Sequence, residues 1–423
     1  MRTTLWASTI KTIITVGAFS ITIGCSTACF SQSDTIKTRV YHQTPEDQLS
    51  VKLDSSKQRD LADEIYKLLG KTNSFNKAQK PKKINFSIIP TLGYTLSTGF
   101  AVDLTSNAAF YTDSKHDENL SAIVNDLVYD TKDQKLLYLR SEIWAKDNDY
   151  KFVGDVRTLE YPTTTYGLGS ATTNATADNI FFYYIRFYGT IYKKIVPDFY
   201  AGLGYNLDQH LDISEDGNAN GTESDLAKYG NPKETTSSGL NFSLLFDNRR
   251  NQLNPLGGYY ANLVYRQNLT FLGSDQTWQS LELDMRKYLR VSPSSNNVLA
   301  FWGMAWLSSA NTPYLDLPAT GNDMYDNSGR GYAEGRYRGR DMLYLETEYR
   351  FGILKNGLLG GVVFANGETF SGYQSTTFQK IAPGTGAGIR IKANKHSDSN
   401  ICIDYGVGIN GSHGFFVNLG EVF

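Results

Sequence analysis

The sequence predicts an all-β protein, a transmembrane antiparallel up-and-down β-barrel of about 16 strands. Three observations predict this fold. Hydrophobic residues recur at every second position from Ile84 to Phe423, in segments of about ten residues or more, the length a tilted strand needs to cross a bilayer. Aromatic residues make up 13% of the chain, with 28 Tyr, and Tyr favours membrane interfaces. The mean hydropathy of -0.36 excludes a bundle of membrane-spanning helices.

The alternation is clear between residues 281 and 291. Leu281, Leu283 and Leu289 fall on one face of the expected strand, and Glu282 and Arg290 fall on the other. Successive side chains of a strand point to opposite faces, so a membrane barrel turns its apolar face to lipid and its polar face to the lumen. The expected strands are 84–95, 98–112, 121–130, 135–147, 150–158, 179–195, 199–213, 237–247, 258–272, 277–292, 297–310, 340–352, 357–370, 382–393, 400–410 and 412–423.

The lengths of the connections predict the sidedness of the barrel. Short connections follow several even-numbered strands, for example 292–296 and 353–356. Longer ones follow strands five, seven and eleven, at 159–178, 214–236 and 311–339. Outer-membrane barrels have short periplasmic turns and long external loops, so we expect both termini in the periplasm.

Residues 1–32 are expected to be an export signal. Arg2 and Lys11 are their only charged residues, and the apolar stretch 13–23 is too short to span a bilayer. Cleavage after this stretch is the favoured interpretation. Lipid attachment at Cys25 is the alternative that the sequence leaves open.

The remaining chain divides into two parts. Residues 33–82 are polar and predict a short periplasmic segment with a helix at 58–69, and residues 83–423 form the barrel. Without the signal, Cys402 is nearly the only cysteine. A disulfide framework and a Cys-rich metal site are therefore excluded.

Composition and motifs also exclude several functions. The net charge of -2 argues against a nucleic-acid partner, which needs a basic face. Ser412 and His413 are adjacent, so on a strand they point to opposite faces and are badly placed for proton transfer. No nucleotide-binding loop or HExxH motif is present. We expect no catalytic residue, no cofactor and no metal.

A turn signature follows the eighth expected strand. Asp247 and Arg249 precede Asn254, Pro255 and Gly258. Asn and Pro start a tight turn, and Gly permits a positive φ. The expected sidedness places this turn in the periplasm.

Two further segments carry recognisable patterns. Arg330, Gly331 and Tyr332 lie in the connection 311–339, and Asn366 follows Phe-Ala in the thirteenth strand. With the turn, they resemble three motifs of the BamA/TamA surface-antigen family of outer-membrane barrels. These motifs are the Asp-x-Arg…Asn-Pro-x-x-Gly turn, the Arg-Gly-Phe/Tyr tip of the sixth external loop and Phe-x-Asp-x-Gly on strand thirteen.

The resemblance implies how the loop is anchored. In the family this loop folds back into the barrel, and its Arg meets acidic groups on strands twelve and thirteen. Arg330 is then expected in the lumen, with Glu348 as the acid of strand twelve. Asn366 stands where the family has Asp, so we expect a weaker anchor.

The end of the chain and its missing modules complete the comparison. Phe423 resembles the terminal aromatic signal of outer-membrane barrels, although Glu421 departs from the usual hydrophobic residue. Members of the family that insert barrels carry periplasmic POTRA modules. Residues 33–82 are too few for one, so the chain resembles a barrel-only branch.

The resemblance implies insertion of protein or lipid, or translocation, at the outer membrane. A weak seam between the strands 84–95 and 412–423 would open, and a periplasmic or outer-membrane protein would deliver the substrate. Outer-membrane lipid and lipopolysaccharide are the expected surroundings; the oligomeric state stays open. The alternative is a passive or gated pore, because a barrel of about 16 strands is wide enough for a channel unless it is plugged. Whether loop 311–339 fills the lumen decides between the seam and the pore.

Overall fold

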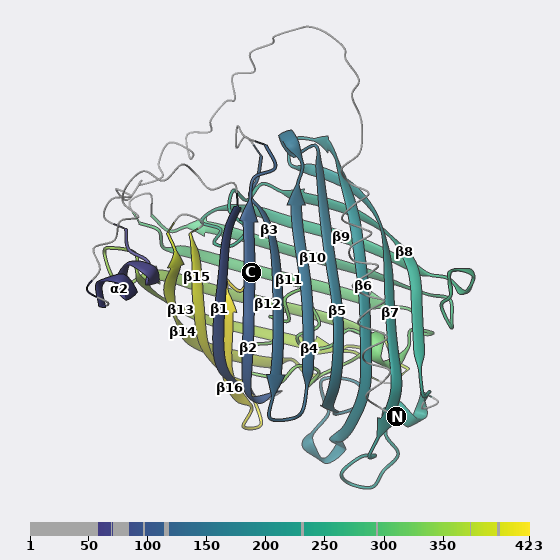
Figure 1. Cartoon of the computed structure of the whole chain (residues 1–423). Coiled ribbons are helices and arrows are strands. Elements are labelled where there is room, and N and C mark those ends of the chain that lie inside the picture. Colours follow the sequence, from purple (N-terminus) through teal and green to yellow (C-terminus); the bar gives the residue numbers. More distant parts are fainter. Residues whose placement is uncertain are drawn as a thin grey trace, which may run out of the picture. The chain divides into compact units, whose positions relative to one another are not determined.

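The computed structural model describes residues 58–68, 70, 84–95, 98–113, 118–229, 232–292, 295–372, 374–395 and 398–423. They form one 16-stranded antiparallel sheet in which the strands follow one another in sequence order, from β1 to β16 (Figure 1). This confirms the expected up-and-down barrel. The expected export signal and Cys25 lie outside the described residues, as does most of the segment 33–82.

Among the described strands, all but β16 have nine or more residues, the length that a tilted membrane crossing needs, and β16 has seven. They are β1 (Ile84–Thr95), β2 (Gly99–Phe110), β3 (Ser121–Asp130), β4 (Lys135–Trp144), β5 (Tyr150–Thr165), β6 (Asp178–Val196), β7 (Phe199–Glu215), β8 (Thr235–Asp247), β9 (Gly258–Asn268), β10 (Trp278–Arg290), β11 (Val298–Ser308), β12 (Asp341–Gly352), β13 (Leu359–Phe370), β14 (Ala382–Asn394), β15 (Ser399–Val407) and β16 (His413–Leu419). The helical elements are α2 (Leu61–Leu68), η4 (Lys146–Asn148), η5 (Asn174–Thr176), α3 (Asp225–Lys228), η6 (Thr270–Leu272) and η7 (Tyr314–Asp316). No helix of the described residues is long and apolar enough to cross a membrane.

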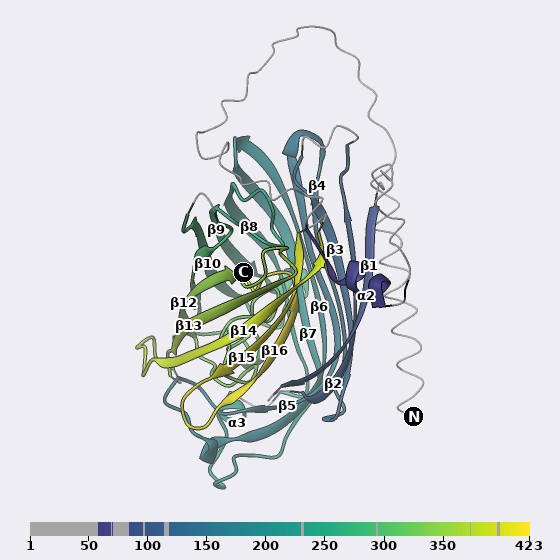
Figure 2. The ribbon, with the colours of Figure 1, turned by 90° about the vertical axis from the view of Figure 1, so that its left-hand side faces the viewer.

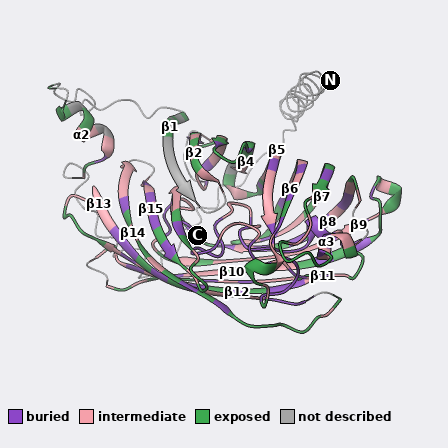
Figure 3. Ribbon diagram, turned by 90° about the horizontal axis from the view of Figure 1, so that it is seen from below, coloured by how far each residue is buried: buried purple, intermediate pink, exposed green. Residues whose placement is uncertain are grey.

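Burial alternates along the strands as the period-two pattern predicts. In β12, Leu345 is 71% exposed on the outer face, whereas its neighbours Tyr344 and Glu346 are 1% and 4% exposed. Figure 3 shows buried and exposed residues in turn along many strands. The wall therefore turns aliphatic side chains outward to lipid and polar or aromatic ones inward.

Three predicted strands have bounds more than three residues from those in the structure, and one of them is β9, which ends at Asn268 rather than 272 because Thr270–Leu272 form η6. β5 extends to Thr165 rather than 158. β4 pairs with it only as far as Glu160, so the last residues, including Pro162, pair with β6 alone, and proline is tolerated at such a sheet edge. β16 ends at Leu419 rather than Phe423, because Gly420 adopts a φ of +100° and the chain leaves the sheet.

The helix α2 begins where Asp60 caps it. The Asp63 N–H donates to the Asp60 side chain at 3.0 Å, and the Asp60 N–H donates to the Asp63 side chain at 3.2 Å. This reciprocal pair satisfies backbone donors that a helix N-terminus leaves open. A helix was expected at 58–69, and the structure has it over the shorter range Leu61–Leu68.

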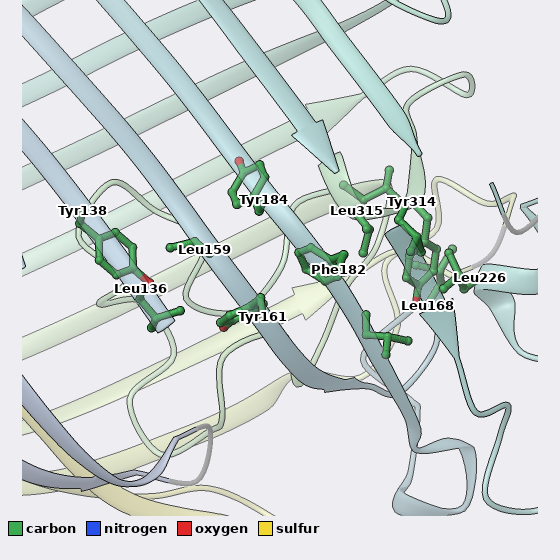
Figure 4. Packing of buried hydrophobic residues seen from close by; sticks show 13 residues of the cluster. Leu136, Tyr138, Leu159, Tyr161, Leu168, Phe182, Tyr184, Leu226, Tyr314 and Leu315 are labelled. Atoms are coloured by element: carbon green, nitrogen blue, oxygen red, sulfur yellow. The ribbon is translucent and has the colours of Figure 1, made fainter. Parts of the chain in front are cut away.

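Buried apolar side chains also form clusters on the inner face of the sheet. One cluster joins residues of β4, β5 and β6 to Tyr314, Leu315 and Leu317, which lie between β11 and β12 (Figure 4). The inner face of the sheet is thus packed against a loop.

Candidate functional site

The connection between β11 and β12 lies inside the barrel. Thr320 and Tyr337 come from its two arms, and the Thr320 N–H donates to the Tyr337 carbonyl at 2.9 Å. Ala319 and Arg338 form an isolated antiparallel bridge next to this bond. The loop is therefore a folded hairpin whose tip carries Arg330, and that side chain is 0% exposed. We call residues 311–339 the lumen loop.

The guanidinium of Arg330 meets three carboxylates. Its Nη2 donates to Glu346 and Glu348 of β12, and its Nη1 donates to Asp404 of β15. The ring of Phe364 lies 3.7 Å below the guanidinium carbon. Burial alone lowers the pKa of Arg330, but the carboxylates outweigh it and raise the pKa well above the usual range.

Two more arginines complete the cluster. Arg350 Nη2 lies 2.7 Å from Glu348, and Arg390 Nη1 lies 2.5 Å from Asp404. Glu346 differs, because among the described residues its recorded partners are Arg330 and the Tyr344 hydroxyl. Arg330 is therefore the cation on which Glu346 depends, whereas Glu348 and Asp404 each have a second one.

Asn366 contacts the loop at a different group from the one that the family motif implies. The Asn366 amide donates to the backbone carbonyl of Arg330 at 2.9 Å, so it holds the loop backbone instead of the guanidinium. Glu346 and Asp404 supply the charge that an Asp at 366 would have supplied. Sequence reasoning missed both, because neither belongs to the recognised motifs.

The backbone of the motif lies in a seat made by small residues of β14 and β15. Gly331 has a φ of +111°, and a Cβ on Gly406 would lie 2.6 Å from the Gly331 nitrogen. Only glycine at both positions permits this approach. The Ser412 hydroxyl donates to the Gly331 carbonyl at 2.7 Å, and the Tyr332 hydroxyl donates to the Pro383 carbonyl at 2.5 Å. The sequence does carry a signal for this close packing. Glycines recur at every second position, at 384, 386 and 388 and then at 406 and 408.

The tip of the lumen loop also reaches the opposite wall. Asp326 Oδ2 lies 2.6 Å from Arg140 of β4, and its Oδ1 lies 2.7 Å from Arg157 of β5. The Tyr325 hydroxyl donates to Glu142 of β4 at 3.1 Å. Since Arg330 is bound to β12 and β15, the loop spans the lumen as a brace between two sides of the barrel.

The chain end turns into the lumen as well, and Figure 3 shows it within the curved sheet. Phe423 is 2% exposed, with ring centroids 5.2 Å from Trp302 and 6.2 Å from Tyr288. Arg350 Nη2 donates to the Phe423 carbonyl at 2.9 Å, and the Asn327 amide of the lumen loop donates to the Val422 carbonyl at 2.8 Å. The terminal residues therefore hold the loop instead of extending β16.

The contacts of Glu421 explain why an acidic residue stands where the terminal signal usually has a hydrophobic one. Its carboxylate lies 2.8 Å from Arg390 and 3.5 Å from Arg350. These arginines lower the pKa of Glu421 against the opposing effect of burial. A hydrophobic residue here would leave both arginines with one acid fewer.

The turn signature between β8 and β9 closes part of the same end. Asp247 binds Arg249 through two contacts of 2.9 and 3.0 Å, and both residues are buried. The Asn254 amide donates to the Asp398 carbonyl at 3.2 Å, and the Glu421 N–H donates to the Leu253 carbonyl at 2.7 Å. Pro255 is buried, and Gly258 opens β9 with a φ of +103°. The turn thus joins the chain end and the β14–β15 connection.

A cavity of about 490 Å³ remains beside the lumen loop. Charged side chains of both signs line it, among them Arg186, Arg266, Glu282 and Asp284. Among the described residues, no group of three or more His, Cys, Asp or Glu side chains is placed to hold a metal ion. Apolar side chains, among them Leu136 and Val264, share the lining with these charges.

Three acids of the lumen loop, Asp316, Asp326 and Glu334, have pKa values above the usual range, mainly because they are buried. Burial and the nearby Asp326 raise the pKa of Glu334 to about 7, although Tyr161 and Arg157 oppose the shift. Burial and Asp208 raise the pKa of Asp316 to about 7. Burial of the loop therefore favours the protonated form of Glu334 and Asp316.

Comparison with known proteins places this architecture in a family. The sequence matches the Omp85 superfamily domain over residues 35–416. No curated protein matches it. Among solved structures, the chain is similar to BamA from Haemophilus ducreyi lacking POTRA domains 1-3, with 16% identity and a TM-score of 0.49, over 79% of this chain and 68% of that one.

Two further structures share the fold. CdiB from Acinetobacter baumannii is 13% identical with a TM-score of 0.53, over 81% of this chain and 61% of that one. CdiB from Escherichia coli is 10% identical with a TM-score of 0.53, over 80% of this chain and 62% of that one. The chain spans less than two thirds of either CdiB chain, and at these identities the likeness shows the fold alone. Because the superfamily domain covers most of the sequence, this chain is a member of the Omp85 superfamily, an outer-membrane β-barrel.

Proposed function

We propose that this barrel inserts protein or lipid into the outer membrane, or translocates a substrate across it, by opening the seam between β1 and β16. One observation carries the proposal. Among the described strands, each strand from β2 to β15 is hydrogen-bonded on both sides, whereas β1 and β16 are the two ends of the ladder. They nevertheless lie beside one another (Figures 1 and 2).

An unpaired strand edge is costly inside a bilayer. Lipid offers no hydrogen bonds, so each free N–H or C=O group seeks a partner strand. β1 has 12 residues and β16 has seven, so pairing with β16 cannot cover the whole of β1. This edge favours temporary pairing with an incoming strand. Because β1 and β16 are the two ends of the described ladder, it is also the place where lipid can enter the wall.

Because the lumen loop fills the lumen, a substrate route through the β1–β16 seam is favoured over a route through the lumen. The lumen loop is bonded to β12 and β15 by Arg330 and to β4 and β5 by Asp326, and the chain end is bonded to the loop. A gated pore is the second candidate. The observation that favours it is the charged cavity of about 490 Å³ beside the loop, which would widen if the brace at Asp326 were released.

The surroundings of the protein belong to the same proposal. The three longest connections between strands, 166–177, 216–234 and 309–340, leave one end of the sheet, and the turn 353–358, α2 and the chain end lie at the other. We place the short turns and both termini in the periplasm, with residues 1–32 as the export signal and 33–82 as a periplasmic segment. Lipopolysaccharide then surrounds the loop end, a partner protein delivers the substrate at the turn end, and the barrel carries no catalytic group.

Locking the seam tests this function. Ser87→Cys in β1 and Asn418→Cys in β16, in a protein whose Cys402 is replaced by Ser, are joined with a flexible bifunctional reagent. Gly420, at the kink, is avoided. The matched control joins Leu343→Cys of β12 to Thr369→Cys of β13, which are already register partners.

The two locks should have different consequences in cells. The seam lock should leave a folded barrel, judged by heat-modifiable gel mobility, that no longer supports the cellular role of the protein. The control lock should leave that role intact. Full function with complete seam crosslinking rejects the opening seam and leaves the gated pore.

A further inference from the structure

The short helix α2 carries an apolar face that no described residue covers well. Ile65 is 47% exposed and Leu68 is 86% exposed. With Leu61 they recur at the spacing of one helix face, since successive residues turn by about 100°. Isolated helices of eight residues are unstable in water, so α2 must be stabilised by contacts with its surroundings.

The opposite face of α2 fastens it to the barrel. Lys395, in the β14–β15 connection, places its Nζ 2.8 Å from the Asp63 carboxylate, and its N–H donates to the Asp60 side chain at 3.2 Å. The Arg59 N–H donates to the Asn356 carbonyl of the β12–β13 turn at 3.1 Å. On a helical wheel Asp63 lies about 160° from Ile65, so these contacts orient the apolar face away from the polar anchor.

The turn to which α2 is tied is also apolar on its outside. Ile353 and Leu354 are 50% and 44% exposed. A Cβ on Gly361 would meet the rings and methyl groups of Phe351 and Ile353, so these side chains lie over the same face of β13. Val363, two residues along β13 on that face, is 48% exposed among the lipid-facing side chains of the barrel. The apolar surface of the turn thus continues the lipid-facing surface.

We propose that α2 is a membrane-surface helix, with Ile65 and Leu68 inserted into the periplasmic leaflet of the outer membrane beside β12–β15. The occupant of its apolar face is phospholipid. Continuity with the lipid-facing surface favours lipid over a protein partner, and the Lys395 anchor fixes the helix at the membrane edge, so a short helix suffices. The choice of leaflet rests on the proposed topology; contact with lipid does not.

Placing a fluorescent reporter on α2 tests the proposal. Single cysteines at Ile65→Cys, Leu68→Cys and Lys67→Cys, in a protein whose other cysteines are serines, carry an environment-sensitive dye. Lys67 is exposed and lies on the same helix, about 160° from Ile65 and about 100° from Leu68 on a helical wheel, so it is the matched control. The full chain is reconstituted in phosphatidylcholine vesicles with and without brominated lipid, and folding is checked by heat-modifiable mobility.

The expected result is a blue-shifted emission at 65 and 68 that brominated lipid quenches several-fold more than at 67. Aqueous iodide should show the reverse order. Equal iodide quenching at all three positions means that the helix stands in water, and it overturns the proposal. Protection at 65 and 68 from both quenchers means that protein covers the face, and it overturns the proposal in favour of a protein contact. None of these readings depends on seam opening, so a failure here leaves the proposed function standing.

Discussion

Removing the Arg330 charge should cost much of the stability of the lumen loop, and the loss should be coupled to Glu346 more than to Glu348. Arg330 is 0% exposed and is bound to Glu346, Glu348 and Asp404. In Arg330→Met the apolar stem remains while the charge is removed. Glu348 keeps Arg350 and Asp404 keeps Arg390, but Glu346 keeps only the Tyr344 hydroxyl.

The magnitude follows from the cost of a buried charge without its partner. Breaking a buried ion pair on one side costs about 3–5 kcal/mol, with less where lumen water reaches the group. Arg330→Met and Glu346→Gln should each approach that range. The double variant should be more stable than the sum of the two losses predicts by about 1–3 kcal/mol, the usual coupling of contacting residues. The corresponding coupling with Glu348→Gln should be smaller, because Arg350 stays bound to Glu348 in every variant.

The assay is a double-mutant cycle on the purified barrel in lipid vesicles. Urea unfolding gives the free energy of each variant, heat-modifiable gel mobility confirms folding, and limited proteolysis reports on the lumen loop. Additive effects of Arg330→Met and Glu346→Gln would refute the assignment of Arg330 as the cation that holds Glu346. Equal coupling with Glu346 and Glu348 would show that the arginines of the cluster stabilise both acids together, and that Glu346 does not depend on Arg330 alone.

Three further predictions follow from the same structure. A protease site inserted at 216–220 should be cut in intact cells and one at 292–296 should not; cutting at the second site reverses the proposed topology. The loop should lose protection from protease as the pH rises from 4.5 through about 7, because burial raises the pKa of Glu334 from 4.5 to about 7 and the packed loop binds a proton that a released loop gives up. Glu334→Gln should make this dependence shallower without abolishing it, because the pKa of Asp316 is also raised, and an unchanged slope would exclude Glu334 as a source. Phe423→Ala should cost about 3–5 kcal/mol, as buried Phe truncations do, and a loss near zero in urea unfolding would mean that the chain end is not seated against Trp302.

The strands could be predicted from sequence because their signal is local. Alternation with period two needs no knowledge of the neighbours, so all 16 strands were found and most bounds agree within three residues. Three bounds differ by more, at the ends of β5, β9 and β16, and the ends of β5 and β16 show the physical causes. The fifth strand was expected to end at 158, although β5 continues through Pro162 to Thr165, where it has lost its β4 neighbour. Gly420 was taken as part of β16, although its φ of +100° turns the chain inward.

The candidate site could be predicted only in part, because half of it depends on long-range pairing. A motif identified Arg330 and one acid, and the structure places that acid, Glu348, against the guanidinium. Asp404 is 74 residues from Arg330 in sequence, and Asp326 meets Arg140 across 186 residues. No local pattern selects such partners among the many lumenal charges of a barrel. Only the register of the strands and the path of the loop bring them together.

The most direct test of the central claim is single-channel conductance of the purified protein in planar bilayers. The claim is that the lumen loop closes the barrel, so that substrates pass by the seam. The unaltered protein should show low or flickering conductance, and deletion of 322–338 should raise it sharply. Asp326→Asn, which weakens the bond to Arg140 and Arg157 without shortening the loop, should give an intermediate value and serves if the deletion does not fold. A large, steady conductance in the unaltered protein would contradict the account and identify the barrel as an open pore.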